Sequence, residues 1–254
     1  LDGEGVLQFG VDVARKRDKL AIAIRRGNTI VEIFAEALGQ DDHVRGVEIV
    51  IEHGKKYRRP HERKPRLVYD QTGPEGQAFG KELRAQKADE HFDIYPIQMG
   101  DPPRDRRNYD RRRDELACKF ALWLKHGSIP TNPNLEAQIE ATTSNRVEVS
   151  YGSSGRKWEV TRIILNDDIR KLLDGDSPDE RNACELCIVD VDGSETEAPA
   201  NDTAPQEESQ VIAAETKQVQ QAPQAPANDV MVDFDDLDMS DRLDAFTRMS
   251  WGQS

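Results

Sequence analysis

The sequence predicts a mixed α/β fold, in which three antiparallel strands continue into parallel strands and helices flank the sheet. Three short apolar runs follow one another within residues 6–34, and after them apolar residues at helical spacing alternate with further short apolar runs. Closely spaced strands form antiparallel hairpins, whereas strands separated by helices are typical of parallel pairing. The longest apolar runs have four or five residues, which excludes a protein that spans a membrane by helices.

The first half of the chain is predicted to supply the main sheet. The runs LQFGVDVA, LAIAI and TIVEIF predict three strands, and a helix is expected over residues 41–53 with Gly54 as its end. The run RLVYD at residues 66–70 predicts a strand, the segment around residues 78–85 a helix, and DIYPI at residues 93–97 another strand. A hairpin unit is therefore followed by a helix and then by a strand, helix, strand unit.

The second half is predicted to be mainly helical, with one extra β-hairpin. Apolar residues at 116–124 favour a helix that ends at Gly127, and Leu135 and Ile139 indicate a short helix. The run VEVSYGSSGRKWEV, at residues 147–160, predicts a hairpin that turns at residues 152–155.

A last helix is expected from Ser177 towards Val189. Ser177 is a suitable N-cap, Pro178 suits the first helical position, and Glu180 completes the pattern of a capping box. Cys184 and Cys187 fall inside this helix with no second pair or nearby histidine, so we predict core residues there rather than a redox or zinc pair.

The composition divides the chain near Gly193. Residues 1–193 are predicted to form one domain, residues 194–228 a disordered linker without aromatic residues, and residues 229–254 an acidic amphipathic tail. The tail suits either a partner-docking segment or an unstructured end. Three unevenly placed cysteines and an N-terminus without a secretion signal favour a reducing, cytoplasmic setting, and the absence of a starting Met suggests a piece of a longer protein.

Basic residues are clustered although the formal net charge is −13. Residues 194–254 carry 13 acidic and 3 basic side chains, which leaves residues 1–193 close to neutral, at −3. Such clusters suit contacts with a phosphate backbone. The alternative interpretation is that they are only a solvated loop and a solvated helix face. The predicted DNA-binding residues are Lys55, Lys56, Arg58, Arg59, Arg63, Lys64, Arg104, Arg106, Arg107, Arg111, Arg112, Arg156 and Lys157.

Three aspartates are candidate metal ligands. Asp12 and Asp70 lie at the ends of two predicted strands, and Asp179 lies at the start of the last predicted helix. Three converging carboxylates repel one another unless cations neutralise them, and oxygen ligands without His or Cys favour Mg²⁺ or Mn²⁺. Two such ions during catalysis suit phosphodiester hydrolysis, and Asp12 is expected to bind both of them. The alternative is that each aspartate only stabilises a turn or caps a helix.

These residues also carry a resemblance to a known family. The order of elements is similar to that of RNase H-like nucleases. The runs GVDVARKRDKLAIAIRRG, RLVYDQTGPEGQAFGKEL, NYDRRRDELACKFALWLKHGSIP and NDDIRKLLDGDSPDERNA resemble the C-terminal nuclease domain of the large terminase subunit of tailed bacteriophages. The resemblance covers about residues 7–190, and the SPD motif after a DIRKLL-type helix is its most specific part.

The resemblance implies a Mg²⁺- or Mn²⁺-dependent endonuclease that cuts concatemeric double-stranded viral DNA at the start and end of genome packaging. It implies Asp12, Asp70 and Asp179 as the catalytic, metal-binding acids. It also implies a portal protein and a small terminase subunit as partners, and the cytoplasm of the bacterial host as the location. The chain departs from the family pattern at Asn182, where an aspartate is common, and at Asn166, where a lysine is common.

Other functions remain as alternatives. A junction resolvase has the same fold, and a packaging module with a weakened nuclease centre is suggested by Asn166 and Asn182. An actin-like phosphotransferase would need a second matching half, which the chain lacks. No phosphate-binding loop of the G-x-x-x-x-G-K-[ST] type occurs, so the packaging ATPase is absent from this chain.

Overall fold

The computed structural model describes residues 5–13, 19–39, 42–150 and 157–191, and the side chains of Ser150 and Trp158 are not described. The predicted linker at residues 194–228, the predicted tail at residues 229–254, the hairpin turn and Arg156 lie outside the described residues.

The main sheet has five strands in the order β3-β2-β1-β4-β5. Three of them are antiparallel neighbours: β1 (Leu7–Asp12), β2 (Lys19–Arg26) and β3 (Thr29–Ala37). β4 (Arg66–Asp70) lies parallel to β1, and β5 (Asp93–Ile97) lies parallel to β4. This pairing confirms the predicted mixed sheet. A helix separates β3 from β4 and another separates β4 from β5, as the connection of parallel strands requires.

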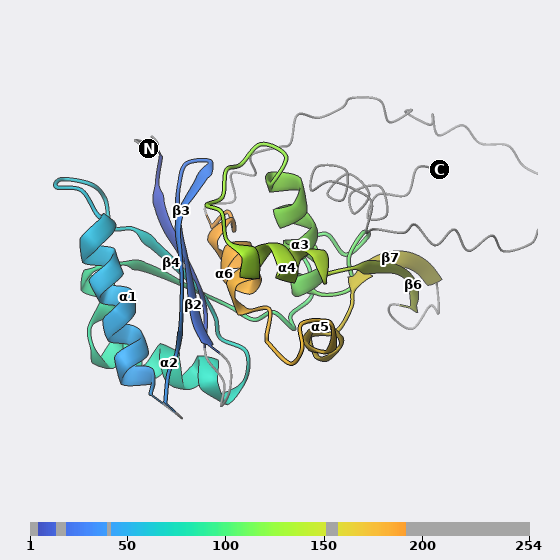
Figure 1. Cartoon of the computed structure of the whole chain (residues 1–254), viewed down its shortest axis with the longest axis horizontal. Helices are drawn as coiled ribbons and strands as arrows, with labels where there is room; N and C mark the ends of the chain where they lie inside the picture. The colour runs from blue at the N-terminus through green and yellow to red at the C-terminus, as the bar shows by residue number, and fades with distance from the viewer. Residues whose placement is uncertain (1–4, 14–18, 40–41, 151–156, 192–254) are drawn as a thin grey trace, which may run out of the picture.

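Helices cover both faces of this sheet, as Figure 1 shows. One face carries α1 (His43–Tyr57) and α2 (Gly73–Ala85), and the short 3₁₀ helix η1 (Ala88–Glu90) follows them. The other face carries α3 (Arg112–Trp123), α4 (Pro133–Glu140) and α6 (Asp179–Cys187). The hairpin of β6 (Ser144–Ser150) and β7 (Lys157–Ile163), followed by α5 (Asn166–Leu172), lies beyond α3 and α4.

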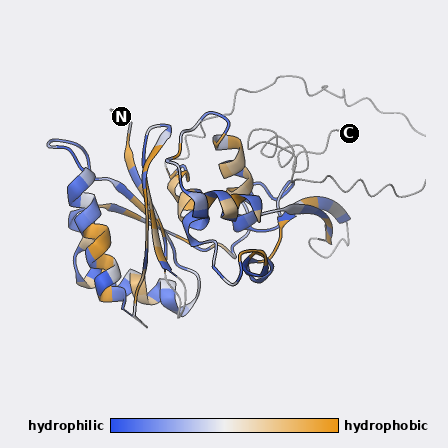
Figure 2. Ribbon diagram, in the orientation of Figure 1, coloured by the Kyte–Doolittle hydropathy of each residue, from blue (hydrophilic) through white to orange (hydrophobic). Residues whose placement is uncertain are grey.

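Two apolar layers follow from the alternation of side chains along the strands. Phe9 and Val11 of β1 pack with Val50 of α1 and Phe79 of α2 in the larger core. On the opposite face, Val68 of β4 packs with the helix α6. Apolar residues accordingly line the strands and the inner sides of the helices (Figure 2). No helix among the described residues is long and apolar enough to cross a membrane.

The closest packing in this layer is between α6 and the middle of β1. A Cβ atom at Gly10 would overlap the carbonyl oxygen of Ala183 and the backbone nitrogen of Cys187. Cys184 and Cys187 are fully buried at this contact, which confirms their prediction as core residues. Glycine at position 10 therefore lets the helix backbone lie directly against the strand.

Three predicted helix ends are wrong. α3 ends at Trp123, before Gly127, although the backbone nitrogen of Gly127 still donates to the Trp123 oxygen at 2.8 Å. α1 continues past Gly54 to Tyr57. Gly54 does not end the helix; it leaves room on the buried helix face for the ring of Phe92. α6 begins at Asp179 with Pro178 as its N-cap, so the predicted capping box does not form. Instead the Ser177 hydroxyl accepts a hydrogen bond from Arg170 Nη2 at 3.2 Å.

We expect Gly10→Ala to destabilise the domain by about 3 kcal/mol, because the added methyl group meets helix backbone that cannot move without shifting α6. Urea denaturation followed by circular dichroism measures the loss. Gly100→Ala is the matched control, since a Cβ atom there has no neighbour within 4 Å. Equal stabilities of the two variants would contradict the close packing of α6 on β1.

Candidate functional site

Asp12 and Asp70 lie next to each other at one end of the main sheet. They are the last residues of β1 and β4, which are parallel neighbours paired up to Val11 and Tyr69. Continuing this register by one residue places Asp12 beside Asp70, on strands about 4.8 Å apart. The carboxyl ends of these two strands therefore form the floor of the candidate site.

Both aspartates face the layer that contains α6. Side chains alternate along a strand, so Asp12 points to the same face as Gly10, which contacts α6. Asp70 likewise points to the same face as Val68, which packs with α6 and α3.

The third acid comes to this end of the sheet from α6. Asp179 is the first residue of the helix and is only 5% exposed. Its Oδ2 accepts a hydrogen bond from the backbone nitrogen of Lys19, the first residue of β2, at 2.9 Å. Because β2 pairs antiparallel with β1, Lys19 lies at the same end of the sheet as Asp12.

The two strand-end aspartates are held by hydrogen bonds from the protein. Asn182 Nδ2 donates to Asp12 Oδ2 at 2.8 Å. The backbone nitrogen of Thr72 donates to Asp70 Oδ1 at 2.8 Å, and Thr72 Oγ1 accepts from the backbone nitrogen of Met99 at 2.9 Å. These bonds fix the orientation of each carboxylate.

A second glycine contact supports the turn that carries Asp70. A Cβ atom at Gly76 would lie 2.5 Å from the backbone oxygen of Asp70 and 2.7 Å from the Cα of Gln71. The first turn of α2 therefore packs directly on the backbone of the DQTG turn, where Gly73 has a positive φ of 76°.

The donor set fits a hard divalent cation in its chemistry. The three acids supply carboxylate oxygens, the ligands that Mg²⁺ and Mn²⁺ prefer. Among the described residues, however, no three His, Cys, Asp or Glu side chains are grouped closely enough to form a complete metal site. The three acids thus lie at one end of the sheet, and each accepts a hydrogen bond from the protein. They do not lie close enough together to coordinate one ion without rearranging.

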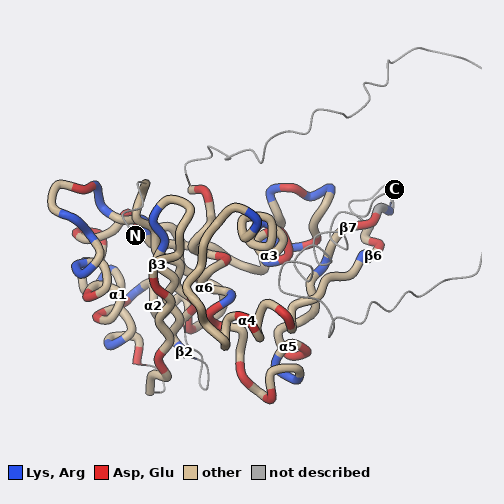
Figure 3. The backbone as a smooth tube through the Cα atoms, turned by 45° about the horizontal axis from the view of Figure 1, so that its top comes forward, with Lys and Arg blue, Asp and Glu red and all other residues tan. Residues whose placement is uncertain are grey.

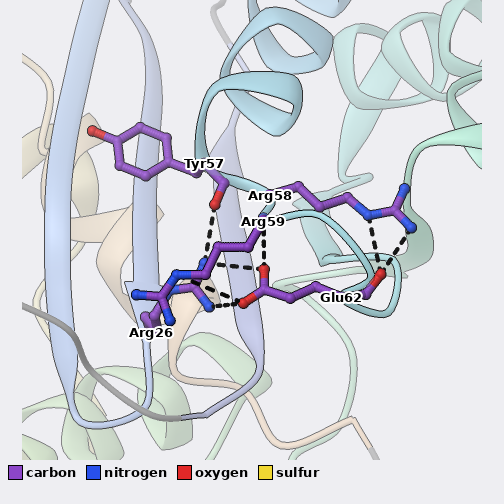
Figure 4. Close-up of polar contacts among 5 residues, drawn as sticks. All are labelled: Arg26, Tyr57, Arg58, Arg59 and Glu62. Atoms are coloured by element: carbon purple, nitrogen blue, oxygen red, sulfur yellow. Dashed lines mark hydrogen bonds and ion pairs between the residues drawn. The ribbon is translucent and has the colours of Figure 1, made fainter.

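The first basic cluster lies at the other end of the sheet. It occupies the end of α1 and the following loop, which are attached to Arg26, the last residue of β2. Arg26 Nη2 donates to the backbone oxygen of Tyr57 at 3.0 Å, and its guanidinium binds the Glu62 carboxylate at 2.5 and 3.2 Å (Figure 4). Since Arg26 pairs with Leu7, where β1 begins, this loop and Asp12 are separated by the six residues of β1, about 17 Å.

The loop of the first cluster is ordered by its own hydrogen bonds. The Glu62 backbone oxygen accepts from Arg58 Nη2 at 2.9 Å, and the Glu62 carboxylate accepts from the backbone nitrogen of Arg59 at 2.9 Å (Figure 4). Lys55, Arg63 and the other predicted basic side chains of this cluster are exposed. The cluster is therefore a fixed, positively charged loop on the α1 side of the sheet.

The second basic cluster lies on the α6 side, in the loop before α3. Arg104, Arg106 and Arg107 are exposed, and Arg111 is partly buried. Figure 3 shows Lys and Arg positions in a loop beside α3. The loop is tied to the hairpin, because Arg162 Nη2 of β7 lies 2.7 Å from Asp110 Oδ2. Lys157 of the same hairpin is exposed and pairs with Glu148 at 2.5 Å.

Arg112 differs from the other residues of the second cluster. Its side chain is 9% exposed and lies 2.7 Å from the fully buried carboxylate of Glu115. Glu115 Oε2 also accepts from the backbone nitrogen of Arg104 at 2.8 Å. The burial of Arg112 therefore does not support its prediction as a DNA-binding residue, because its guanidinium pairs with Glu115, the carboxylate that also binds the loop.

The sequence alone did not show the protein donors of the site. The backbone nitrogen of Lys19 becomes a donor only through the fold, whereas an Asp side chain commonly accepts from the backbone nitrogen two residues on, as Asp70 does from Thr72. Asn182 departs from the pattern of the family that the sequence resembles, and its bond to Asp12 depends on the fold.

Comparison with solved structures places this fold among viral nuclease domains. The structure is similar to the nuclease domain of the large terminase subunit gp2 of bacterial virus Sf6, with a TM-score of 0.53 and 14% identity over 74% of this chain and 90% of that chain. One mutant of that domain, solved with calcium and with manganese, matches with TM-scores of 0.53 and 0.52, at the same identity and coverage. No protein-family model and no curated protein matches the sequence. The chain therefore has the fold of the nuclease domain of a phage large terminase subunit, as the resemblance of its sequence implied.

Proposed function

We propose that this chain is the metal-dependent endonuclease domain of a viral large terminase subunit, which cuts double-stranded DNA during genome packaging. The observation that carries the proposal is the position of Asp12, Asp70 and Asp179 at the same end of a sheet with this fold. The similar Sf6 domain was solved with calcium and with manganese, which supports a divalent cation as the cofactor.

The three aspartates would hold Mg²⁺ or Mn²⁺, two ions during catalysis. When bound, such ions lower the pKa of a water molecule and stabilise the negative charge that develops on the leaving oxygen of a phosphodiester. The chain itself supplies orientation: Asn182, the Thr72 nitrogen and the Lys19 nitrogen each hold one carboxylate. The acids therefore start from fixed positions when the cation and the substrate phosphate arrive.

The second basic cluster is proposed to hold the DNA backbone next to the acids. Arg104, Arg106, Arg107 and Arg111 lie on the same side of the sheet as α6, with Lys157 on the adjoining hairpin. Contacts to phosphates position a duplex without reading its bases, so sequence preference is expected to be low. The first cluster, from Lys55 to Lys64, is proposed as a separate contact, because it lies at the far end of the sheet.

The same proposal gives the chain a portal protein and a small terminase subunit as partners, in the cytoplasm of a bacterial host. One observation favours a second candidate function, a packaging module with a weakened nuclease centre. The amide of Asn182 stands where the family commonly has an acid, and it already binds Asp12. Retained binding to DNA or a portal with no cleavage in any divalent cation would favour this second function.

We expect Asp70→Asn to lower cleavage of supercoiled plasmid in Mn²⁺ by at least about 100-fold, because the amide removes one negative ligand while leaving the fold intact. Initial rates on agarose gels measure the effect. Asp93→Asn is the matched control, since Asp93 is exposed at the opposite end of the neighbouring strand β5. Undiminished cutting by the Asp70 variant would remove this residue from the mechanism.

We expect the double variant Arg106→Ala/Arg107→Ala to weaken duplex binding for all sequences. The slope of log Kd against the logarithm of the salt concentration should fall by about two units, because two phosphate contacts are lost. Fluorescence anisotropy at several salt concentrations, with metal omitted, gives this slope.

The variant Lys55→Ala/Arg63→Ala changes the same number of exposed charges at the far end of the sheet. On a short duplex that reaches only one end of the sheet, we expect it to leave the slope unchanged. Equal slopes for both variants on the short duplex would contradict the assignment of the second cluster as the contact nearest the acids.

A further inference from the structure

A chain of polar side chains with a buried ion pair at its start ends at Asp12. In α6, Arg181 Nε lies 2.9 Å from Glu185 Oε1, with the two side chains 3% and 1% exposed. Arg181 Nη2 donates to Asn182 Oδ1 at 2.8 Å, and Asn182 Nδ2 donates to Asp12 Oδ2 at 2.8 Å. The amide of Asn182 therefore links a buried cation to a strand-end carboxylate.

The partners of Asn182 determine which way its amide points. A guanidinium can only donate hydrogen bonds and an ionised carboxylate can only accept them. The amide oxygen must therefore face Arg181, and the amide nitrogen must face Asp12. The opposite orientation would place donor against donor and acceptor against acceptor.

Arg181 is itself fixed from several sides. Its Nη1 donates to Thr142 Oγ1 at the end of α4, and its backbone nitrogen donates to Gln138 Oε1 at 2.9 Å. Its contact with Glu185 is an ion pair, since the atoms are close but not aligned as a hydrogen bond. Burial raises the pKa of Glu185, and the positive charges of Arg181 and Arg113 oppose that rise.

We propose that Asn182 is a positioning residue for Asp12: it holds one carboxylate oxygen with a neutral donor whose direction is set by Arg181. This inference rests on the proposed nuclease function, in which Asp12 is a metal ligand. An aspartate at position 182 would accept from Arg181 but could not donate to Asp12. Two facing carboxylates repel unless a cation lies between them, so such a chain would depend more strongly on metal.

The test compares Mn²⁺ binding and thermal unfolding of the full chain and its variants. In Asn182→Ala we expect Mn²⁺ affinity, measured by calorimetry, to fall about tenfold, because Asp12 loses its orientation. In Asn182→Asp we expect a lower Tm without metal and a larger rise of Tm on adding Mn²⁺ than in the unchanged protein. The control Asn28→Asp adds the same charge at an exposed turn at the far end of the sheet and should match the unchanged protein in both measurements.

Each outcome has a separate meaning. An equal loss of Tm with and without Mn²⁺ in Asn182→Asp, or unchanged affinity in a folded Asn182→Ala, would overturn the positioning role and leave the nuclease proposal standing. Failure of the unchanged protein to bind Mn²⁺ would overturn both proposals. If Asn182→Ala does not fold, the isosteric Asn182→Asp variant decides the question by itself.

Discussion

The close contact of helix α6 with the middle of strand β1 is the constraint on which the rest of the site depends. Gly10 has no side chain, so the helix backbone at Ala183 and Cys187 lies directly on the strand. Any side chain at position 10 would hold α6 away from the sheet. At this short separation, Asp179 reaches the backbone of Lys19 and Asn182 reaches Asp12. A packing contact in the core thus determines the position of polar groups at the end of the sheet.

The charged residues buried in α6 fix its rotation as well as its distance from the sheet. Arg181 and Glu185 form an ion pair, and Glu180 is bonded to Gln138 of α4. Removing one partner of a buried pair costs about 3–5 kcal/mol, so a rotated or shifted helix would leave such charges uncompensated. A pair of this kind adds little net stability, but the cost of leaving either charge unpaired disfavours other arrangements of α6. That arrangement places Asp179 and Asn182 over the strand ends.

The two basic clusters show that charge density along the chain does not locate a binding surface. The first cluster is held at the amino end of β1 by Arg26 and Glu62, whereas the second lies between α3 and the hairpin on the α6 side. Within the second cluster, Arg112 is buried on Glu115, whereas Arg104, Arg106 and Arg107 are exposed. Residues that look equivalent in the sequence therefore have different surroundings in the folded chain.

The sequence by itself determined the order and type of the elements, because apolar periodicity depends on which face of each segment is buried. It indicated all five strands of the sheet, and its pattern at residues 66–70 and 93–97 matches β4 and β5 residue for residue. It also selected Asp12, Asp70 and Asp179 as candidate acids, since two end buried strands and one begins a helix. Helix ends were less predictable: the cap at Pro178 and the continuation of α1 through Gly54 depend on neighbours from distant segments.

Only the tertiary structure decided how the site is assembled. The donors to the acids are two backbone nitrogens and the amide of Asn182, and no periodicity marks such groups, since their function depends on which segment the fold brings beside them. Long-range packing also determines the separation of the basic clusters, the burial of Arg112 and the link from Arg181 to Asp12. Local pattern determines which face of an element is buried, whereas long-range packing determines which polar groups meet.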